Sequence, residues 1–263
     1  MECPNTGRAA HHLLKQVARR GRNASVPICQ HWGVNARQFA QLLSAAMVTA
    51  WATLLGAPIP IASVSAAPCP DVEVTFARDT GEPPGVGGVG QEFIDSLRSQ
   101  VGGRSLGVYA VNYPATDDLG PSASAGAGDA NAHVESMAAS CPNTRLVLGG
   151  HSQGALVIDL ITISRAPVAG LMPQTLPADV ADHVAVVATF GNAADRFLGA
   201  PMNEVSPWYG AKAIDLCAPG DPVCTVGAVF SMPSQDDWVS PAHQSYLRSG
   251  MPSQAATFAA AHL

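Results

Sequence analysis

The pentapeptide Gly150-His151-Ser152-Gln153-Gly154 places a serine between two glycines, where an apolar run, 146–148, meets a helical segment, 153–163. In this context a G-x-S-x-G sequence forms a tight turn from strand to helix, and larger residues at the glycine positions would collide. The serine hydroxyl then stands at the helix N-terminus, where the helix dipole favours a developing negative charge. The segment predicts that Ser152 is a catalytic nucleophile; the alternative is an ordinary glycine-rich turn.

A serine nucleophile requires a general base, and with this turn the chain order is serine, acid, histidine. His243 and His262 are the histidines that lie well beyond Ser152 with acidic residues in between. His262 is the penultimate residue, where chain ends fray. His243 follows a long loop, at the expected start of the last helix, so we predict that it is the general base. His151 is expected to support the turn.

The orienting acid has several candidates, all aspartates: Asp159, Asp179, Asp182, Asp195, Asp215, Asp221, Asp236 and Asp237. Asp221 follows an expected strand, 213–216, and catalytic acids of open sheets lie at the carboxyl ends of strands. It also lies between Cys217 and Cys224, and a disulfide-closed loop would hold its carboxylate against an imidazole. We therefore predict Asp221 as the acid, with a purely structural role as the alternative.

Short β-branched runs alternate with helical segments along the chain from residue 69 onward. A spacing of four residues in Val89, Phe93, Leu97 and Val101 predicts a helix. The expected strands are 72–76, 106–111, 146–148, 184–190 and 213–216, and the further expected helices are 122–140, 153–163 and a segment after Pro241. This alternation predicts an α/β fold, a three-layer sandwich with a mostly parallel central sheet and helices on both faces.

Charge divides the 263 residues into two parts. Residues 1–67 carry six basic side chains and one acidic, a net charge of +5, whereas 68–263 carry eight basic and nineteen acidic, a net charge of −11. The first part resembles an export leader, with an apolar stretch at 42–55 and small residues that predict cleavage after Ala66 or Ala67. An uncleaved anchor is the alternative. The acidic remainder argues against nucleic acid as a partner and weakly favours a soluble monomer.

Four of the six cysteines lie in the acidic part: Cys69, Cys141, Cys217 and Cys224. An even number in an exported protein predicts two disulfides, for which three connectivities exist. Cys217 and Cys224 are close enough to pair locally, which would leave Cys69 to pair with Cys141. No CxxC pair or neighbouring histidine at ligand spacing favours a metal site.

Beyond these patterns, the chain from Cys69 onward resembles the cutinase family of small secreted serine esterases, with an α/β-hydrolase-like fold. The resemblance rests on segments spread along that part: Phe76-Ala77-Arg78, Asn112-Tyr113-Pro114-Ala115, Cys141-Pro142-Asn143-Thr144, Leu148 to Gly154, Ala188 to Asn192, Asp215 to Cys224, and His243 with Tyr246. It implies one esterase domain at 68–263, which would follow the leader predicted at 1–67.

The resemblance also implies functional residues. Ser152 would be the nucleophile, Asp221 the orienting acid and His243 the general base, with Thr80 and Gln153 forming the oxyanion hole. Cys69–Cys141 and Cys217–Cys224 would be the disulfides, and no metal or cofactor would be required. The substrate would be a carboxylic ester of short to medium acyl length, or a lipid or polyester, and the protein would be secreted or retained at the cell envelope.

Two features depart from the family. Asp79 precedes Thr80 where relatives usually have glycine; its carboxylate would lower activity if it faced the oxyanion site, or it would serve only as a turn residue. The loop 225–242 is long and apolar, and Val226, Phe230 and Trp238 are expected to line the acyl groove and touch lipid or polymer surfaces, or else to pack the loop onto the core. A phospholipase or thioesterase, and a weakly catalytic lipid-binding protein, are the alternative functions.

Overall fold

The computed structural model describes residues 68–163, 167, 170–226 and 233–263. The predicted leader, its apolar stretch and its cleavage site therefore lie outside the described residues, as does Phe230. The strands are β1 Val72–Ala77, β2 Leu106–Ala110, β3 Arg145–His151, β4 Val184–Phe190 and β5 Ala213–Leu216. They form one sheet in the order β2-β1-β3-β4-β5, and every neighbouring pair is parallel.

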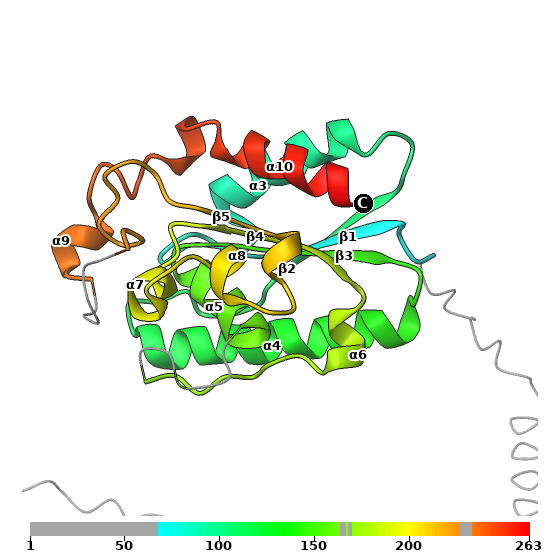
Figure 1. Ribbon diagram of the computed structural model, residues 1–263, viewed down its shortest axis with the longest axis horizontal. Helices are drawn as coiled ribbons and strands as arrows, with labels where there is room; N and C mark the ends of the chain where they lie inside the picture. Colours follow the sequence, from blue (N-terminus) through cyan, green and yellow to red (C-terminus); the bar gives the residue numbers. More distant parts are fainter. Residues whose placement is uncertain (1–67, 164–166, 168–169, 227–232) are drawn as a thin grey trace, which may run out of the picture. The chain divides into compact units, whose positions relative to one another are not determined.

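Helices cover both faces of this sheet (Figure 1), as the alternating sequence pattern predicted. The longer helices are α3 Gly87–Gln100, α4 Leu119–Ser140, α5 Gln153–Thr162 and α10 Met251–His262. Helices α3 and α10 pack against each other on one face, and α4 packs against α5 on the other. Short helical turns complete the order: α6 Ala178–Ala181, α7 Ala194–Leu198, α8 Met202–Val205, η1 Gly210–Lys212, α9 Gln235–Trp238 and η2 Tyr246–Arg248.

The core is split into two layers by the sheet, because successive side chains of a strand point to opposite faces. On β3, Leu146 and Leu148 belong to the cluster under α4 and α5, whereas Val147 belongs to the cluster under α3 and α10. The predicted stripe on α3 is confirmed: Val89, Phe93, Leu97 and Val101 are all buried. Both faces of the central strands are therefore buried, and this burial fixes the register of the strands.

The sequence predictions differ from the structure mainly at element ends. β3 continues to His151, beyond the predicted end at 148, because Gly149 and Gly150 stay in register with β1 and β4. The last helix begins at Met251, so the prediction that His243 starts this helix is wrong. The chain instead makes a series of turns from 241 to 244 before η2. No helix within the described ranges is long and apolar enough to cross a membrane.

Two disulfides tie this domain together, in the pairing that the sequence favoured. Cys69 bonds to Cys141, which joins the segment before β1 to the end of α4. Cys217 bonds to Cys224, which closes the loop that follows β5. The second bridge encloses Asp221 and thereby fixes the path of the backbone at the carboxyl edge of the sheet.

Candidate active site

The turn after β3 holds Ser152 in a strained backbone conformation. Its φ of 56° and ψ of −117° are rare for a residue other than glycine. The turn is possible because its flanks lack side chains: a Cβ on Gly150 would lie 2.2 Å from the carbonyl oxygen of Gly154, and one on Gly154 would lie 2.0 Å from that of Ala77. A serine in this position at the start of α5 presents its Oγ above the sheet edge.

Three of the predicted residues meet at this edge in a line of hydrogen bonds. The Ser152 Oγ lies 2.9 Å from Nε2 of His243, and Nδ1 of the same ring lies 2.9 Å from Oδ2 of Asp221. All three side chains are buried, with no more than 1% of each residue exposed. A base with one nitrogen on a hydroxyl and the other on a carboxylate can take the hydroxyl proton and be stabilised as an imidazolium.

Asp221 remains charged although it is fully buried, because donors converge on its two oxygens. Besides His243, the Tyr246 hydroxyl donates to Oδ2 at 2.6 Å, and the backbone N–H of Val223 donates to Oδ1 at 2.8 Å. Burial alone would raise the pKa of Asp221, but these hydrogen bonds and the nearby His243 outweigh it, and the pKa is lowered. The sequence did not predict this role for Tyr246; its place one turn after His243 was the available signal.

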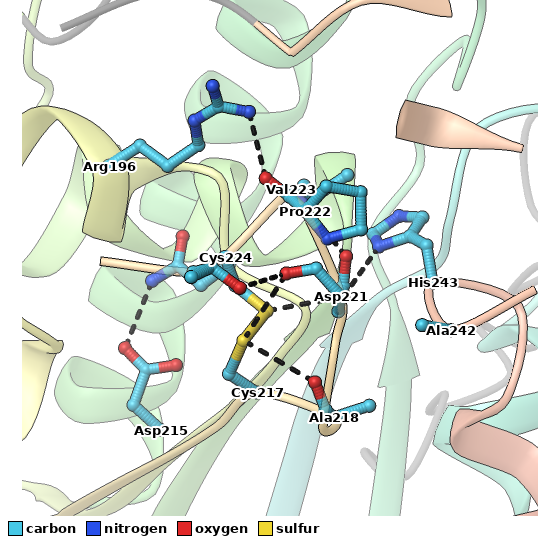
Figure 2. Close-up of a disulfide and its surroundings, with 12 residues drawn as sticks. Arg196, Asp215, Cys217, Ala218, Asp221, Pro222, Val223, Cys224, Ala242 and His243 are labelled. Carbon is cyan, nitrogen blue, oxygen red and sulfur yellow. Dashed lines mark hydrogen bonds and ion pairs between the residues drawn. A yellow bond between two sulfur atoms is a disulfide. The ribbon is translucent and has the colours of Figure 1, made fainter. Parts of the chain in front are cut away.

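The backbone around Asp221 is held by the Cys217–Cys224 bridge and by a neighbouring helix (Figure 2). The Asp221 N–H donates to the Ala218 carbonyl at 2.9 Å, and the Thr225 N–H donates to the Asp221 carbonyl at 3.2 Å. From α7, Arg196 donates to the Pro222 carbonyl at 2.8 Å. Figure 2 shows the Asp221 carboxylate pointing toward the His243 ring from this closed loop.

Thr80 and Gln153, the predicted oxyanion donors, contact each other beside Ser152. The Gln153 side-chain amide donates to the Thr80 Oγ1 and to the Thr116 carbonyl, both at 2.9 Å, and its oxygen accepts from Ser122 at 2.7 Å. The Thr80 hydroxyl oxygen is thus occupied as an acceptor and its hydrogen is available to a ligand. The backbone N–H of Gln153 lies in the first turn of α5, where amides have no intrahelical partner.

A cavity of about 190 Å³ opens beside these groups. Its lining residues include the site residues and members of the loop before His243: Asp79, Thr80, Asp117, Leu119, Ser152, Gln153, Gln235, Trp238, Val239 and Gln244. Trp238, a predicted groove residue, also packs edge-to-face on the His243 ring. Val226, another predicted groove residue, is 45% exposed and does not line this cavity.

Two sets of side chains have atoms close enough to share a metal ion, judged over the described ranges alone. Asp79, His151 and His243 form the first, but both ring nitrogens of His243 already contact Ser152 and Asp221. Cys217, Asp221 and Cys224 form the second, but the two cysteines are bonded to each other and offer no thiolate. The arrangement therefore suits nucleophilic chemistry by the serine better than metal binding.

Comparison with known proteins finds relatives over the same part of the chain. The Cutinase family model matches residues 68–263. "Carboxylesterase Culp1" of Mycobacterium tuberculosis is 50% identical over 80% of this chain and 89% of the relative, and "Phospholipase Culp4" of the same species is 47% identical over 87% and 93%.

Solved structures share the architecture. A cutinase of Trichoderma reesei in complex with a phosphonate inhibitor is 30% identical, with a TM-score of 0.54 over 84% of this chain and 87% of that one. The catalytic core of a Trichoderma reesei acetyl xylan esterase, at 24% identity, shares the fold with a TM-score of 0.61 over 74% of this chain and 100% of that one. By the extent of the family match and the identity to its relatives, the chain belongs to the cutinase family of carboxylic ester hydrolases.

Proposed function

We propose that this protein is an exported serine esterase that cleaves carboxylic esters through an acyl-enzyme intermediate on Ser152. The observation that carries the proposal is the line of 2.9 Å contacts from Ser152 through His243 to Asp221. The relatives named as a carboxylesterase and a phospholipase support ester hydrolysis as the reaction class. Neither a metal nor a cofactor is needed for it.

In the acylation step, the Ser152 Oγ attacks the ester carbonyl carbon while its proton passes to Nε2 of His243. Asp221 holds the imidazole in the tautomer that can accept this proton and stabilises the imidazolium. The negative charge that develops on the carbonyl oxygen is stabilised by the Gln153 N–H and the Thr80 hydroxyl. Such a donor is worth about 10²–10³ in rate. Collapse of the intermediate breaks the ester C–O bond, and His243 gives its proton to the leaving alcohol.

Deacylation repeats the sequence with water. A water molecule attacks the acyl carbonyl, His243 accepts its proton, and the proton returns to the Ser152 Oγ as the carboxylic acid leaves. The net reaction consumes one ester and one water and yields one acid and one alcohol. Hydrolysis therefore restores the enzyme without any other reactant.

We infer from the size of the cavity that esters with short acyl chains are the better substrates. Its volume of about 190 Å³ lies below the roughly 300–1,000 Å³ of sites that enclose drug-sized ligands. Its walls combine the apolar Leu119, Trp238 and Val239 with polar side chains such as Gln235 and Gln244. An acyl chain of a few carbons fits this space, whereas a long one would have to extend past Trp238 and Val239.

Export is part of the proposal, and it is supported by the disulfides after residue 67 and by the composition of the segment before it. Two disulfides are typical of proteins that leave the reducing cytosol. The basic and apolar segment at 1–67 has the composition of a leader.

Hydrolysis of p-nitrophenyl esters with two, four, eight and twelve acyl carbons tests the enzymatic proposal. We expect kcat/KM to be highest for the two shorter esters and Ser152→Ala to lose at least about 10³-fold on each. Folding of the variant is checked by circular dichroism. Hydrolysis that persists in folded Ser152→Ala would refute the proposal, and a folded wild-type protein without hydrolysis of any ester would favour a binding function.

A further inference from the structure

The carboxylate of Asp79 lies inside the site where the proposed mechanism needs a hydrogen-bond donor. Asp79 follows β1, and its side chain is only 14% exposed. One oxygen, Oδ1, accepts from the Thr80 N–H at 2.6 Å, and the residue lines the same cavity as Ser152 and Gln153. The Ser152 hydroxyl and the backbone N–H of Gln153 both lie near enough to this carboxylate to lower its pKa. The carboxylate therefore lies beside the Gln153 N–H, one of the two donors that the proposed mechanism assigns to the substrate oxyanion.

Within the part of the chain that the structure describes, no lysine or arginine forms an ion pair with this carboxylate. His151 is the nearest basic side chain from β3, with its Nδ1 3.9 Å from Oδ2 of Asp79. Burial, and then the neighbouring His243, lowers the pKa of His151 to about 4, so this ring is neutral near pH 7. The Arg78 guanidinium donates to the carbonyls of Glu82 and Tyr113, both at 2.8 Å.

The other ionisable groups around Asp79 come from each element packed against it. The Glu82 carboxylate accepts the Asp79 N–H at 2.8 Å, Tyr113 lies after β2, Asp117 lines the cavity, and His243 faces the site from the segment before η2. Burial raises the pKa of Asp79, and the nearby Ser152 hydroxyl, the hydrogen bond from the Thr80 N–H and the nearby His243 oppose this rise only in part. Asp79 therefore keeps its proton to a higher pH than an ordinary aspartate does.

The two protonation states would act oppositely on an ester. An ionised Asp79 competes for the Gln153 N–H and repels the oxyanion that forms beside Ser152. A neutral Asp79 offers an O–H in the same position, and a buried carboxylic acid can serve as an oxyanion donor. Only the neutral form is complementary to the transition state.

We propose, on the basis of the proposed esterase function, that Asp79 is a further catalytic residue, which donates a hydrogen bond to the oxyanion as a neutral acid and blocks the oxyanion site as a carboxylate. Hydrolysis then falls as pH rises and Asp79 loses its proton. The pH profile of kcat/KM therefore has an alkaline limb that belongs to Asp79.

The test is the pH profile of kcat/KM on p-nitrophenyl butyrate for the wild type, Asp79→Asn and Asp79→Gly. The asparagine amide cannot ionise but still donates, so we expect Asp79→Asn to lose the alkaline limb and to exceed the wild type by at least about tenfold at pH 9. Asp79→Gly should also lose that limb, but its kcat/KM should level off below that of Asp79→Asn because glycine has no side-chain donor. Asp117→Asn, which removes another carboxylate from the same cavity, should keep the alkaline limb.

An Asp79→Asn enzyme that retains the wild-type alkaline limb would overturn the inference, as would equal scaling of the rate at every pH, which is expected if Asp79 only shapes the turn. Thermal melts show whether each variant is folded, and Asp79→Asn is nearly isosteric. The proposed function fails separately, if Ser152→Ala keeps its activity, and the inference then falls with it. An unchanged limb in an enzyme that depends on Ser152 refutes the inference alone.

Discussion

Asp221 and Asp195 are both buried aspartates, and each lies five residues beyond the end of a strand, Asp221 after β5 and Asp195 after the neighbouring β4. At neutral pH, however, Asp221 is ionised and Asp195 keeps its proton. Asp221 accepts from an imidazole, a phenol and a backbone amide, and its pKa is lowered. Asp195 has one oxygen without a hydrogen-bond partner, and burial together with the nearby Asp215 and Asp159 raises its pKa to about 11.

The contrast shows that the depth of burial does not decide whether a carboxyl group keeps its charge. Both residues are at most 1% exposed. The surroundings decide it: hydrogen bonds to the Asp221 oxygens offset part of the lost hydration, whereas the nearby Asp215 and Asp159 add to the cost of ionising Asp195. Asp159 extends the second case: it is fully buried beside Asp215 and Asn192, and burial raises its pKa well above the usual value. We interpret Asp221 as the working carboxylate and Asp159 and Asp195 as neutral acids of the core.

The largest expected effect separates the two aspartates by activity. Asp221→Asn should lower kcat by about 10³–10⁴, because a neutral amide neither holds the required tautomer of His243 nor stabilises its imidazolium. Asp195→Asn should change kcat less than threefold, since the native group is already neutral. Initial rates on p-nitrophenyl butyrate measure both, and comparable losses in the two variants would break the comparison.

The two disulfides offer a second separation. In the loop-entropy model, removing Cys69–Cys141 costs about 4.4 kcal/mol of unfolding free energy, and removing Cys217–Cys224 costs about 2.5. The bridge with the smaller cost encloses Asp221, so we expect the Cys217→Ser/Cys224→Ser variant to lose more activity per folded molecule than Cys69→Ser/Cys141→Ser. Urea unfolding and active-site titration provide the two quantities. If the Cys69→Ser/Cys141→Ser variant lost more of both stability and activity, the short bridge would not position Asp221.

Next comes the dependence of stability on pH. Asp195 has a pKa of about 11 in the folded protein and about 3.9 when unfolded, so the folded state binds the extra proton between these values. The unfolding free energy therefore decreases as pH rises above about 4, by up to about 1.4 kcal/mol per pH unit from this group. Asp195→Asn should remove this contribution and stabilise the protein more at pH 8 than at pH 5. Urea midpoints at the two pH values measure it, and an identical pH slope would contradict a neutral Asp195.

The smallest effect concerns one of the donors to Asp221. Tyr246→Phe removes the hydroxyl at 2.6 Å while keeping the ring, which packs on His151 and Phe190. We expect about a tenfold loss of kcat, since a hydrogen bond to a charged group is worth about 1.5–3 kcal/mol. A pH profile distinguishes this role from simple packing. Loss of the Tyr246 hydroxyl should raise the pKa of Asp221, so the rate loss in Tyr246→Phe should grow toward low pH, whereas a packing defect would lower the rate equally at all pH values.

Much of this account could be predicted from the sequence, because the deciding interactions are local. The turn at Ser152 depends on Gly150 and Gly154, which have no room for a side chain, and the strand and helix around it follow from short apolar runs. Asp221 could be selected because Cys217 and Cys224 flank it and a strand precedes it. The fold class followed from the alternation of these elements.

What the sequence did not predict depends on contacts between distant segments. Asp195 and Asp221 cannot be distinguished in the sequence. In the structure, Tyr246 and His243 contact Asp221, whereas Asp159 and Asp215 lie near Asp195. The turns at 241–244 were predicted as helix, because local helix propensity contains no information on the distant contact between His243 and Ser152. The orientation of Asp79 likewise depends on the meeting of β1 and α5.

Covalent labelling with a fluorophosphonate probe tests the central claim most directly, because such a probe reacts with a serine only when a neighbouring base activates it. The measurement is peptide mass spectrometry of the wild type and of folded Ser152→Ala after exposure to the probe near neutral pH. The account predicts a single adduct on Ser152, absent from Ser152→Ala and formed at least about 10²-fold more slowly in Asp221→Asn. A folded wild-type protein that remains unlabelled, or an adduct that forms equally in Ser152→Ala, would contradict it.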